Sequence, residues 1–430
     1  MRKVLLTEPT FIIPFNEAAK DLRILNKPLW LHQRDLLAKY TTEERETPSG
    51  QLADVPKDEV EQIVLRDNLF FDDNFLQSFL PVAIARGKAC QVAFRASDRA
   101  FQEHALPLSR GFKQHPQDPT LYLADFYYFP RGVTDDPEPL VIDLQAREIG
   151  YYWVPSYMAL EQGDLVFQVP LRSFLSIESW VHIFIADVVF GAFARGARVE
   201  NRLETDWRYM LKVFSRSLLE LKQVLDCSEL VTVGRGCTID PSAIIHGPTV
   251  IGENVTIGAG VVIDNCLIGS NVNISQGCQL QLSVVGDGSF LPFRASLMMT
   301  TLMEHSMVAQ NTCLQMCVVG RNTFIGAGNT FTDYNLIPLP IRARAADGSL
   351  QPANREVLGG CVGHNCRIGS GMIIFPARTI ESDTVLFASR ERRVLEKDVT
   401  YDQSDHHTIR NGDQHLRLYP NEGEEVENSW

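Results

Sequence analysis

Long apolar runs are missing from this chain of 430 residues. None approaches the roughly 20 residues that a membrane-spanning helix requires. The opening stretch MRKVLLTEPT turns polar too soon to be a secretory signal peptide. These absences predict a cytoplasmic protein with no membrane partner.

A surplus of basic charge is also missing, because 40 Lys and Arg residues face 53 Asp and Glu residues and leave a net charge of −13. This balance argues against a nucleic-acid partner and against general binding to membrane surfaces. The nine cysteines show no paired C-x2-C spacing, which disfavours a zinc site. Local basic pockets for small anionic ligands remain compatible with the composition.

What the sequence has in abundance is an aliphatic residue every five or six positions after residue 230. The stretch TVIGENVTIGAGVVIDNCLIGSN shows it clearly, with glycine following Ile251, Ile257 and Ile268. A hexapeptide period is the pattern of a solenoid, in which three hexads form one triangular coil with the aliphatic residues inside. It predicts a left-handed parallel β-helix over residues 229–390, with about seven coils between residues 235 and 388.

The period breaks between Phe331 and Val362, so we expect residues 332–357 to leave the coil as an extruded loop. Long loops of this kind are usually functional or disordered. Arg342 and Arg344 carry planar donors that suit phosphate or carboxylate groups. The alternative, with equal weight, is a solvated loop that wraps a neighbouring subunit.

Residues 1–228 alternate short apolar runs with amphipathic stretches, as in KVLLT, VEQIVLRDN and TLYLADFYYFP. This alternation predicts an α/β domain with a mainly parallel sheet flanked by helices. Ligands bind such sheets beyond the carboxyl ends of the strands. Asp67 follows one apolar run, and Asp187 lies in a segment that begins as a strand and becomes a helix.

Two polar or amphipathic segments complete the chain. The stretch DWRYMLKVFSRSLLELKQVLDCSELV has helical spacing of apolar residues and predicts a connecting helix before the repeats. Residues 391–430 form a polar tail that is either mobile or laid across the end of the solenoid. Its histidines, His406, His407 and His415, either bind a metal or are simply solvated.

An α/β domain followed by hexapeptide repeats resembles the bifunctional N-acetylglucosamine-1-phosphate uridyltransferase/glucosamine-1-phosphate acetyltransferase family. The motifs that carry the resemblance are FIGAGNTFTDYN at residues 324–335 and VGHNCRIGSGMIIFPARTI at residues 362–380. The resemblance implies a Rossmann-like, nucleotidyltransferase-like first domain and an acetyltransferase-like β-helix. It also places Asp333, Tyr334 and Asn335 where the family meets the sugar and acetyl groups.

The chain departs from this family at both sites. Gln310 stands where the resemblance places a histidine general base, and a glutamine cannot take up a proton at neutral pH. His305 is the nearest histidine in sequence and the candidate base if acyl transfer persists. Residues 5–30 contain no glycine, although the family holds nucleotide phosphates there on a glycine-rich loop.

Three residues of the first half still match the family's pattern. Lys27 belongs to a retained K-P-L element and would contact substrate. Asp67 and Asp187 match the family's magnesium ligands, so the resemblance implies a Mg²⁺ site with oxygen ligands. The alternative for each aspartate is an ordinary solvated carboxylate at a strand end or on a helix surface.

Two functions of different classes follow. The first is a sugar-phosphate or nucleotide-sugar transferase with an acyltransferase site in the β-helix, acyl-CoA as donor, and a weakened or inactive nucleotidyltransferase domain. The second is a non-catalytic protein that binds sugar nucleotides or serves as an assembly scaffold. In both cases we expect a homotrimer, by resemblance and because flat prism faces can pack around a threefold axis.

Overall fold

The computed structural model describes residues 1–7, 10–47, 50–152, 165–336, 339–409, 415–421 and 424. The chain divides into two compact units, and each contains two separate parts of the sequence. The first unit comprises Met1–Thr10 and Ala18–His182, and the second comprises Phe11–Glu17 and Ile183–Trp430. This division differs from the boundary expected at residue 228, because the helices after residue 183 pack with the β-helix.

The first unit is built on one mixed sheet in the order β12-β9-β11-β7-β1-β6, with β10 beside β11. Its strands are β1 (Arg2–Leu6), β6 (Glu43–Thr47), β7 (Gln62–Arg66), β9 (Cys90–Arg95), β10 (Phe112–Gln114), β11 (Leu121–Phe129) and β12 (Glu138–Val141). Strand β11 runs antiparallel to its neighbours, while β1 pairs in parallel with β6 and β7, and β12 with β9. The expected mainly parallel sheet therefore contains one central antiparallel strand, which its short connection to β10 requires.

The helices of the first unit bury an aromatic core. They are α1 (Leu29–Leu37), α2 (Asp73–Arg86), η1 (Leu52–Asp54) and η2 (Phe101–Ala105). Helix α2 begins where the Asp72 side chain accepts the Phe75 N–H, and ends at Gly87 in the left-handed conformation, as helix caps favour. Its buried residue Phe75 packs against Phe94, Phe126 and Phe174.

Short paired strands surround this core in the first unit. They are β4 (Arg23–Ile24) with β5 (Lys27–Pro28), β8 (Leu69–Phe71) with β15 (Phe174–Ser176), and β13 (Ala146–Tyr152) with β14 (Leu165–Pro170). A further pair consists of β2 (Phe11–Ile12), which belongs to the second unit, and β3 (Glu17–Ala18).

A series of helices precedes the repeats: α3 (Trp180–Phe184), η3 (Ile185–Phe193), α4 (Ala194–Thr205), α5 (Trp207–Glu220) and η4 (Val224–Asp226). The run Trp180–Thr205 is long and apolar enough to cross a membrane by length and composition, contrary to the expectation that no such run exists. Of its most apolar 18-residue window, 89% is buried, as in the core helix of a soluble protein. The connecting helix expected from the sequence is present as α5.

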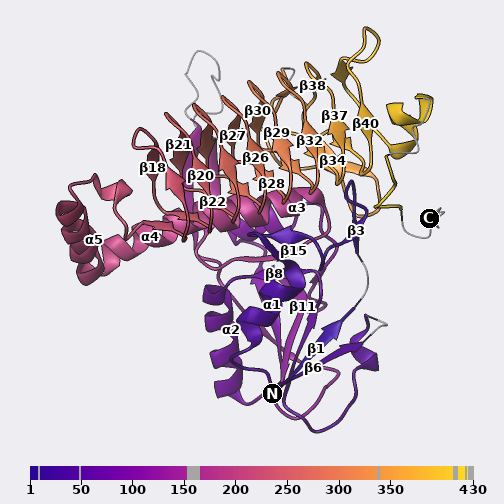
Figure 1. The fold of residues 1–430 in the computed structure, drawn as a ribbon. Helices are drawn as coiled ribbons and strands as arrows, with labels where there is room; N and C mark the ends of the chain where they lie inside the picture. Colours follow the sequence, from indigo (N-terminus) through magenta and orange to yellow (C-terminus); the bar gives the residue numbers. More distant parts are fainter. Residues whose placement is uncertain are drawn as a thin grey trace. The chain divides into compact units, whose positions relative to one another are not determined.

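The second unit contains the expected left-handed parallel β-helix, made of three parallel sheets of eight strands each (Figure 1). It runs from Val231 to Leu395 and has eight coils, against the expected 229–390 with about seven coils between residues 235 and 388. Residues 297–314 contain no glycine, but they continue the coils without a break through β28, β29 and β30.

The first sheet contains β16 (Val231–Val233), β19 (Thr249–Ile251), β22 (Leu267–Ile268), β25 (Val284–Val285), β28 (Thr301–Leu302), β31 (Val318–Val319), β36 (Cys361–Val362) and β39 (Thr379–Ile380). The second contains β17 (Thr238–Ile239), β20 (Thr256–Ile257), β23 (Asn273–Ile274), β26 (Phe290–Leu291), β29 (Met307–Val308), β32 (Phe324–Ile325), β37 (Arg367–Ile368) and β40 (Val385–Leu386). The third contains β18 (Ile244–His246), β21 (Val262–Asp264), β24 (Gln279–Gln281), β27 (Ser296–Met298), β30 (Cys313–Gln315), β33 (Thr330–Phe331), β38 (Ile373–Ile374) and β41 (Val394–Leu395).

Aliphatic columns fill the prism. Ile257 pairs with Ile239 below it and Ile274 above it, and Ile257 and Ile274 are almost completely buried. The central coils have a fixed length: the core residues Ile268, Val285, Leu302 and Val319 stack in register, each 17 residues after the one before. This stacking of like on like explains why the aliphatic period dominates the sequence.

One corner of the prism, between the first and second sheets, is a column of left-handed backbone. Its members have φ between 53° and 71° and recur once per coil: Gly236, Asn254, Asn271, Gly288, His305, Asn322, Asn365 and Asp383. Asn, Asp and Gly adopt this conformation most readily, which accounts for their recurrence. His305 is the one imidazole in the column.

The expected interruption of the coils is also present. Between β33 and β36 the chain leaves the prism and forms a two-stranded antiparallel hairpin, β34 (Arg342–Arg344) with β35 (Leu350–Pro352). Of the expected loop 332–357, residues 337 and 338 lie outside the described part of the chain. The hairpin gives this loop a structure of its own that the sequence did not indicate.

Candidate functional site

A groove of about 380 Å³ runs along the outer side of the third sheet of the β-helix. Strands β18, β21, β24, β27 and β30 are three residues long, so the middle residue points into the prism and its two neighbours point out. The outward residues that give the groove its polar character are His246, Asp264, Gln279, Gln281, Ser296 and Gln315. At about 4.8 Å per strand, the groove extends roughly 19 Å from His246 to Gln315, room enough for a ligand of several linked groups.

An imidazole–carboxylate pair lies at one end of this groove. Nδ1 of His246 lies 2.5 Å from Oδ1 of Asp226, and both side chains are a little over a quarter exposed. An ionised carboxylate only accepts hydrogen bonds, so Nδ1 carries the proton and Nε2 is left as an acceptor. This is the arrangement that prepares a histidine to act as a general base.

A second carboxylate adjoins this pair. Asp264 stands beside His246 in the register of β18 and β21. Burial raises the pKa of Asp264, and the charge of His246 opposes that rise. The sequence offered little sign of this cluster, because Asp226 lies in η4, outside the repeats. Only its contact with the first coil brings it to His246.

The residues of the TDYN motif lie where β33 of the third sheet ends and the loop begins. Burial raises the pKa of Asp333, and the charge of Asp333 contributes to a raised pKa of the neighbouring Cys313 thiol, after burial as the main cause. Tyr334 is half exposed, and the Asn335 amide donates to the Leu339 carbonyl at 3.0 Å. Because Cys313 also lines the third-sheet groove, Asp333 lies at the end opposite His246.

The two loop arginines hold the loop itself. Arg342 donates to the Leu350 carbonyl at 2.6 Å across the hairpin. Arg344 donates to Asp398 at 2.7 Å and to the Gly348 carbonyl at 3.1 Å. Arg344 therefore has a structural role, whereas the exposed Arg342 remains able to meet a ligand.

His305 is placed on a different edge of the prism from Asp333. It occupies the left-handed corner between β28 of the first sheet and β29 of the second, whereas Asp333 follows the third sheet. Gln310 lies at the next corner, between β29 and β30. The structure thus does not bring His305 to the TDYN residues, and a shared role for them is not supported by the topology.

In the first unit, Asp67 follows β7 directly, at the carboxyl end of a parallel strand. It is 5% exposed, and burial raises its pKa to about 6, against the opposing charges of Lys20 and Arg66. Lys27 lies on β5 at the surface, where its ammonium is 2.9 Å from Asp35. A cavity of about 500 Å³ lies at the carboxyl ends of β9 and β12 and is lined by Arg95 and Arg99.

The two aspartates expected to bind magnesium, Asp67 and Asp187, belong to different units of the chain. Asp187 lies in the second unit, is fully buried, and accepts a hydrogen bond from the Thr301 hydroxyl at 2.9 Å. Within the described ranges no three His, Cys, Asp or Glu side chains are arranged to hold a metal. We therefore derive no chemistry through Mg²⁺ for this chain.

The segment Phe11–Glu17, which follows β1 where the family carries its phosphate loop, packs within the second unit. Glu17 accepts two hydrogen bonds from the Arg321 guanidinium, at 2.9 and 2.7 Å. The Pro14 carbonyl accepts from the Ser382 hydroxyl at 3.0 Å, and Phe15 packs against the ring of buried His364 at 4.8 Å between centroids. We call residues 11–17 the docking segment.

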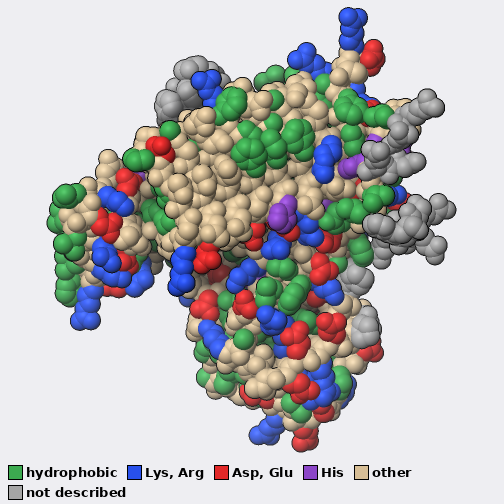
Figure 2. Space-filling model, viewed as in Figure 1, with side chains coloured by type: hydrophobic (Ala, Val, Ile, Leu, Met, Phe, Trp, Pro, Cys, Tyr) green, Lys and Arg blue, Asp and Glu red, His purple; other side chains and the backbone are tan. Residues whose placement is uncertain are grey.

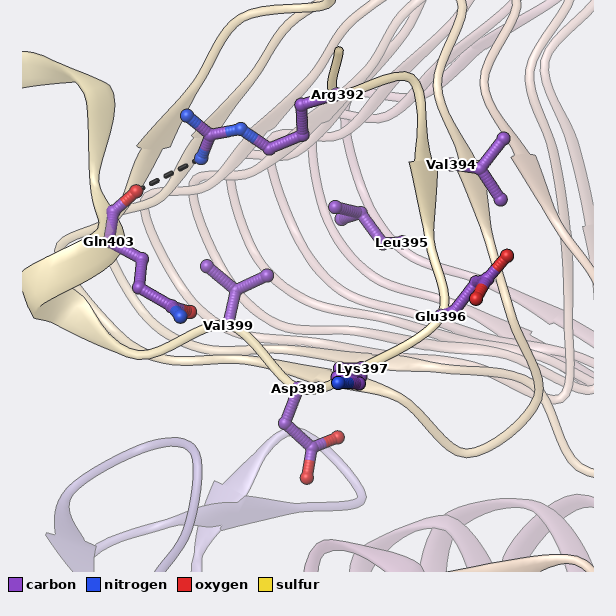
Figure 3. A pocket seen from close by; sticks show the side chains of 8 residues that line it. All are labelled: Arg392, Val394, Leu395, Glu396, Lys397, Asp398, Val399 and Gln403. Carbon is purple, nitrogen blue, oxygen red and sulfur yellow. Dashed lines mark hydrogen bonds between the residues drawn. The ribbon is translucent and has the colours of Figure 1, made fainter.

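The C-terminal end of the β-helix is covered by its own chain. A cavity of about 420 Å³ lies there. Arg392 donates to the Gln403 carbonyl across it at 3.0 Å, the dashed bond in Figure 3. Asp398, one of the carboxylates that line this cavity, accepts hydrogen bonds from Arg344 and from the Thr379 N–H. In the tail, the His406 ring lies tilted against His407 and edge-on to His415, at 4.0 and 5.3 Å between ring centroids, and burial lowers the pKa of His406 to about 4.

The fold defines a hexapeptide-repeat protein with a left-handed β-helix, and residues 227–294 match the family model of the GMPPB C-terminal domain. The chain is 26% identical over 188 residues to the bifunctional protein GlmU of Ruthia magnifica subsp. Calyptogena magnifica, covering 39% of this chain and 41% of that protein. It is 24% identical over 216 residues to the GlmU of Pseudoalteromonas atlantica, covering 46% and 47%. The resemblance indicated by the sequence motifs is confirmed, over less than half the length of these relatives.

Solved structures of similar fold include the UDP-N-acetylglucosamine O-acyltransferase (LpxA) of Moraxella catarrhalis RH4. It has 14% identity and a TM-score of 0.22, over 39% of this chain and 66% of that one. The UDP-N-acetylglucosamine acyltransferase of Campylobacter jejuni has 15% identity and a TM-score of 0.23, over 38% and 68%. These scores carry no argument about the site.

Proposed function

We propose that this chain is a transferase that binds a sugar phosphate or nucleotide sugar in the third-sheet groove and transfers an acyl group to it. The observation that carries the proposal is the hydrogen-bonded pair of His246 and Asp226 at the end of a groove lined by amide and hydroxyl side chains. Similarity to bifunctional protein GlmU supports the substrate class. The chemistry rests on this chain's own residues.

In the proposed reaction, Nε2 of His246 accepts the proton of a sugar hydroxyl or amine as that group attacks the thioester carbonyl of acyl-CoA. The carbon–sulfur bond breaks, and the imidazolium returns the proton to the departing thiolate. Asp226 holds the imidazole in the required tautomer and stabilises its charged form. Gln279, Gln281 and Gln315 supply amide donors and acceptors for the hydroxyls of the sugar.

The first unit takes no catalytic part in this proposal. The docking segment replaces a glycine loop, so the backbone amides that would hold nucleotide phosphates are absent from that position. The Asp333 end of the groove, with Tyr334 and Arg342, is proposed to contact the donor. We further propose that the protein is cytoplasmic and forms a homotrimer, as its resemblance to the family implies.

The test measures thiol release from acetyl-CoA in the presence of a panel of amino sugars, sugar phosphates and nucleotide sugars. His246→Asn should reduce the rate roughly 10²–10⁴-fold, while His305→Asn, a histidine on another edge of the prism, should leave it unchanged. Asp226→Asn should shift the pH profile. Equal rates in the parent and His246→Asn would overturn the assignment.

The alternative is a binding protein without chemistry. It predicts that nucleotide sugars raise the melting temperature while no thiol is released with any member of the panel. Gln279→Ala would then weaken binding and His246→Asn would not. That pair of results would replace the transferase by the binding function.

A further inference from the structure

Helix α5 exposes an unusually apolar surface. Five exposed apolar residues of the helix and its C-cap fall on one stripe, with exposed fractions of 48 to 93%: Trp207, Met210, Phe214, Leu218 and Leu221. Leu211 and Leu219, 50% and 78% exposed, lie beside this stripe. Single exposed apolar residues are ordinary, but a contiguous stripe marks an interaction site. Figure 2 shows hydrophobic side chains gathered on this helix, which Figure 1 places at the N-terminal end of the β-helix.

The helix is held in a defined position by its other side. The Asp206 side chain caps it by accepting the N–H groups of Arg208 and Tyr209, and Leu221 ends it in the left-handed conformation. Tyr209 and Val213 are buried against Cys227 and Leu230. These contacts fix the rotation of the helix about its axis, so the stripe stays exposed to solvent in one copy of the chain.

The spacing of the stripe matches itself when reversed. Relative to Phe214, the other members lie seven and four residues before it and four and seven residues after it. Two copies of α5 related by a twofold axis at Phe214 would thus set Trp207 against Leu221 and Met210 against Leu218. Such a contact is isologous, with the same patch used by both partners.

Charge and area favour a second copy over a lipid surface. Two basic residues of the helix are paired with acids, Lys212 with Glu229 at 2.7 Å and Arg216 with Glu220 at 3.7 Å, and Arg208 lies over the Trp207 ring, 5.7 Å from its centroid. An interfacial helix needs a cationic face toward anionic lipids, and the whole chain carries a charge of −13. Five half-exposed large side chains present on the order of 500 Å² of apolar surface per copy, well toward the 800 Å² of a stable interface.

We propose that α5 is a self-association surface, on which a second copy of this chain docks antiparallel with Phe214 against Phe214. This contact is independent of the third-sheet groove and of any threefold packing of the prism. If both contacts form, trimers pair through α5 into a closed assembly of six chains.

The first experiment compares molar masses by light scattering of the full chain. Phe214→Asp places a charge in the centre of the stripe and should halve the mass of the parent. Ser215→Asp adds the same charge one residue further, on the exposed polar side, and should leave the mass unchanged. Equal masses for the parent and Phe214→Asp would overturn the proposal, and Phe214-dependent pelleting with phosphatidylserine vesicles at unchanged mass would replace it by membrane binding.

The second experiment tests the geometry by oxidative cross-linking. Phe214→Cys should give disulfide-linked dimers, because the two positions meet at the axis, while the parent with its native cysteines should not. Trp207→Cys alone should not cross-link, but Trp207→Cys combined with Leu221→Cys should. Cross-linking of the single Trp207→Cys variant would rule out the antiparallel arrangement.

Discussion

The docking segment and the third-sheet groove use polar side chains in opposite ways. In the docking segment, Glu17 meets Arg321 through two hydrogen bonds and lies 3.2 Å from His364, so its charge is satisfied inside the protein. In the groove, the polar residues of successive coils line an open space of about 380 Å³. The difference shows that a residue's position in a family motif is a poor guide to a ligand site. A better guide is whether its polar side chain already bonds to other groups of the protein.

Two carboxylates illustrate the same contrast through their pKa values. Burial alone would raise the pKa of Glu17, but its contacts with His364 and Arg321 outweigh burial and lower the pKa. Asp67 is also buried, yet the nearby charges do not compensate, and its pKa rises to about 6. Glu17 is thus a structural anion, and Asp67 is a carboxylate of the first unit whose charged form its surroundings do not stabilise.

The largest expected effect is in the β-helix core. Ile257→Asp puts an ionised carboxylate into an aliphatic column, at a position 1% exposed, and should cost about 4–5 kcal/mol or prevent folding. Urea unfolding measures it. Thr256→Asp, on the outward side of the same strand, is the control and should change stability by less than about 1 kcal/mol. Normal stability of Ile257→Asp would contradict the assigned inward direction.

The next effect would break the docking segment. Arg321→Met leaves the buried carboxylate of Glu17 without its guanidinium and should destabilise the chain by about 3–5 kcal/mol. Adding Glu17→Gln should recover part of the loss, because the uncompensated charge is then removed. The exposed Arg235→Met is the control, and an equal loss in Arg235→Met and Arg321→Met would show that the ion pair is not the cause.

A smaller effect, of opposite sign, is expected at Asp67. A carboxyl whose pKa is raised in the folded state stabilises below its unfolded pKa and loses that contribution as pH rises through the folded value, here about 6. Asp67→Asn should therefore stabilise the protein at pH 8, by about 1–3 kcal/mol, with little effect at pH 4. Melting curves against pH, with exposed Asp54→Asn as control, measure it, and destabilisation at pH 8 would indicate a bound cation instead.

The smallest expected effect is on the first unit, where the docking segment stands in place of a phosphate-binding loop. Nucleoside triphosphates with sugar phosphates should give no pyrophosphate release, because the docking segment offers no glycine loop to their phosphates. Melting temperatures should shift by less than about 1 °C on adding the triphosphate alone, since a ligand stabilises only in proportion to its binding. Robust pyrophosphate release would restore a catalytic role to the first unit.

The repeat fold could be predicted from the sequence because one physical requirement, an aliphatic residue stacked on the same residue of the next coil, recurs throughout. The corner position of His305 could also have been predicted, since it occupies the hexad position of Asn254, Asn271 and Asn322. The last strand, β41, could not be predicted, because it pairs with β38 after a stretch that breaks the period.

The candidate site could be predicted only in part. The TDYN motif marked one end of the groove, but His246 and Asp226 come together through packing of η4 on the first coil, a contact that no local pattern encodes. The docking segment was missed for the same reason, because its partners Arg321 and Ser382 lie more than 300 residues away in the chain. Long-range pairing of this kind depends on tertiary structure that periodicity does not specify.

The fixed coil length has a consequence for how this protein can change in size. Leu267, Val284 and Thr301 stack at intervals of 17 residues. An in-frame duplication of 51 nucleotides, three for each of those 17 residues, would therefore add one whole coil and keep every column of stacked side chains aligned. The third-sheet groove would lengthen by about 4.8 Å with each such step. The length of the gene would then set the length of the groove in discrete steps of one coil.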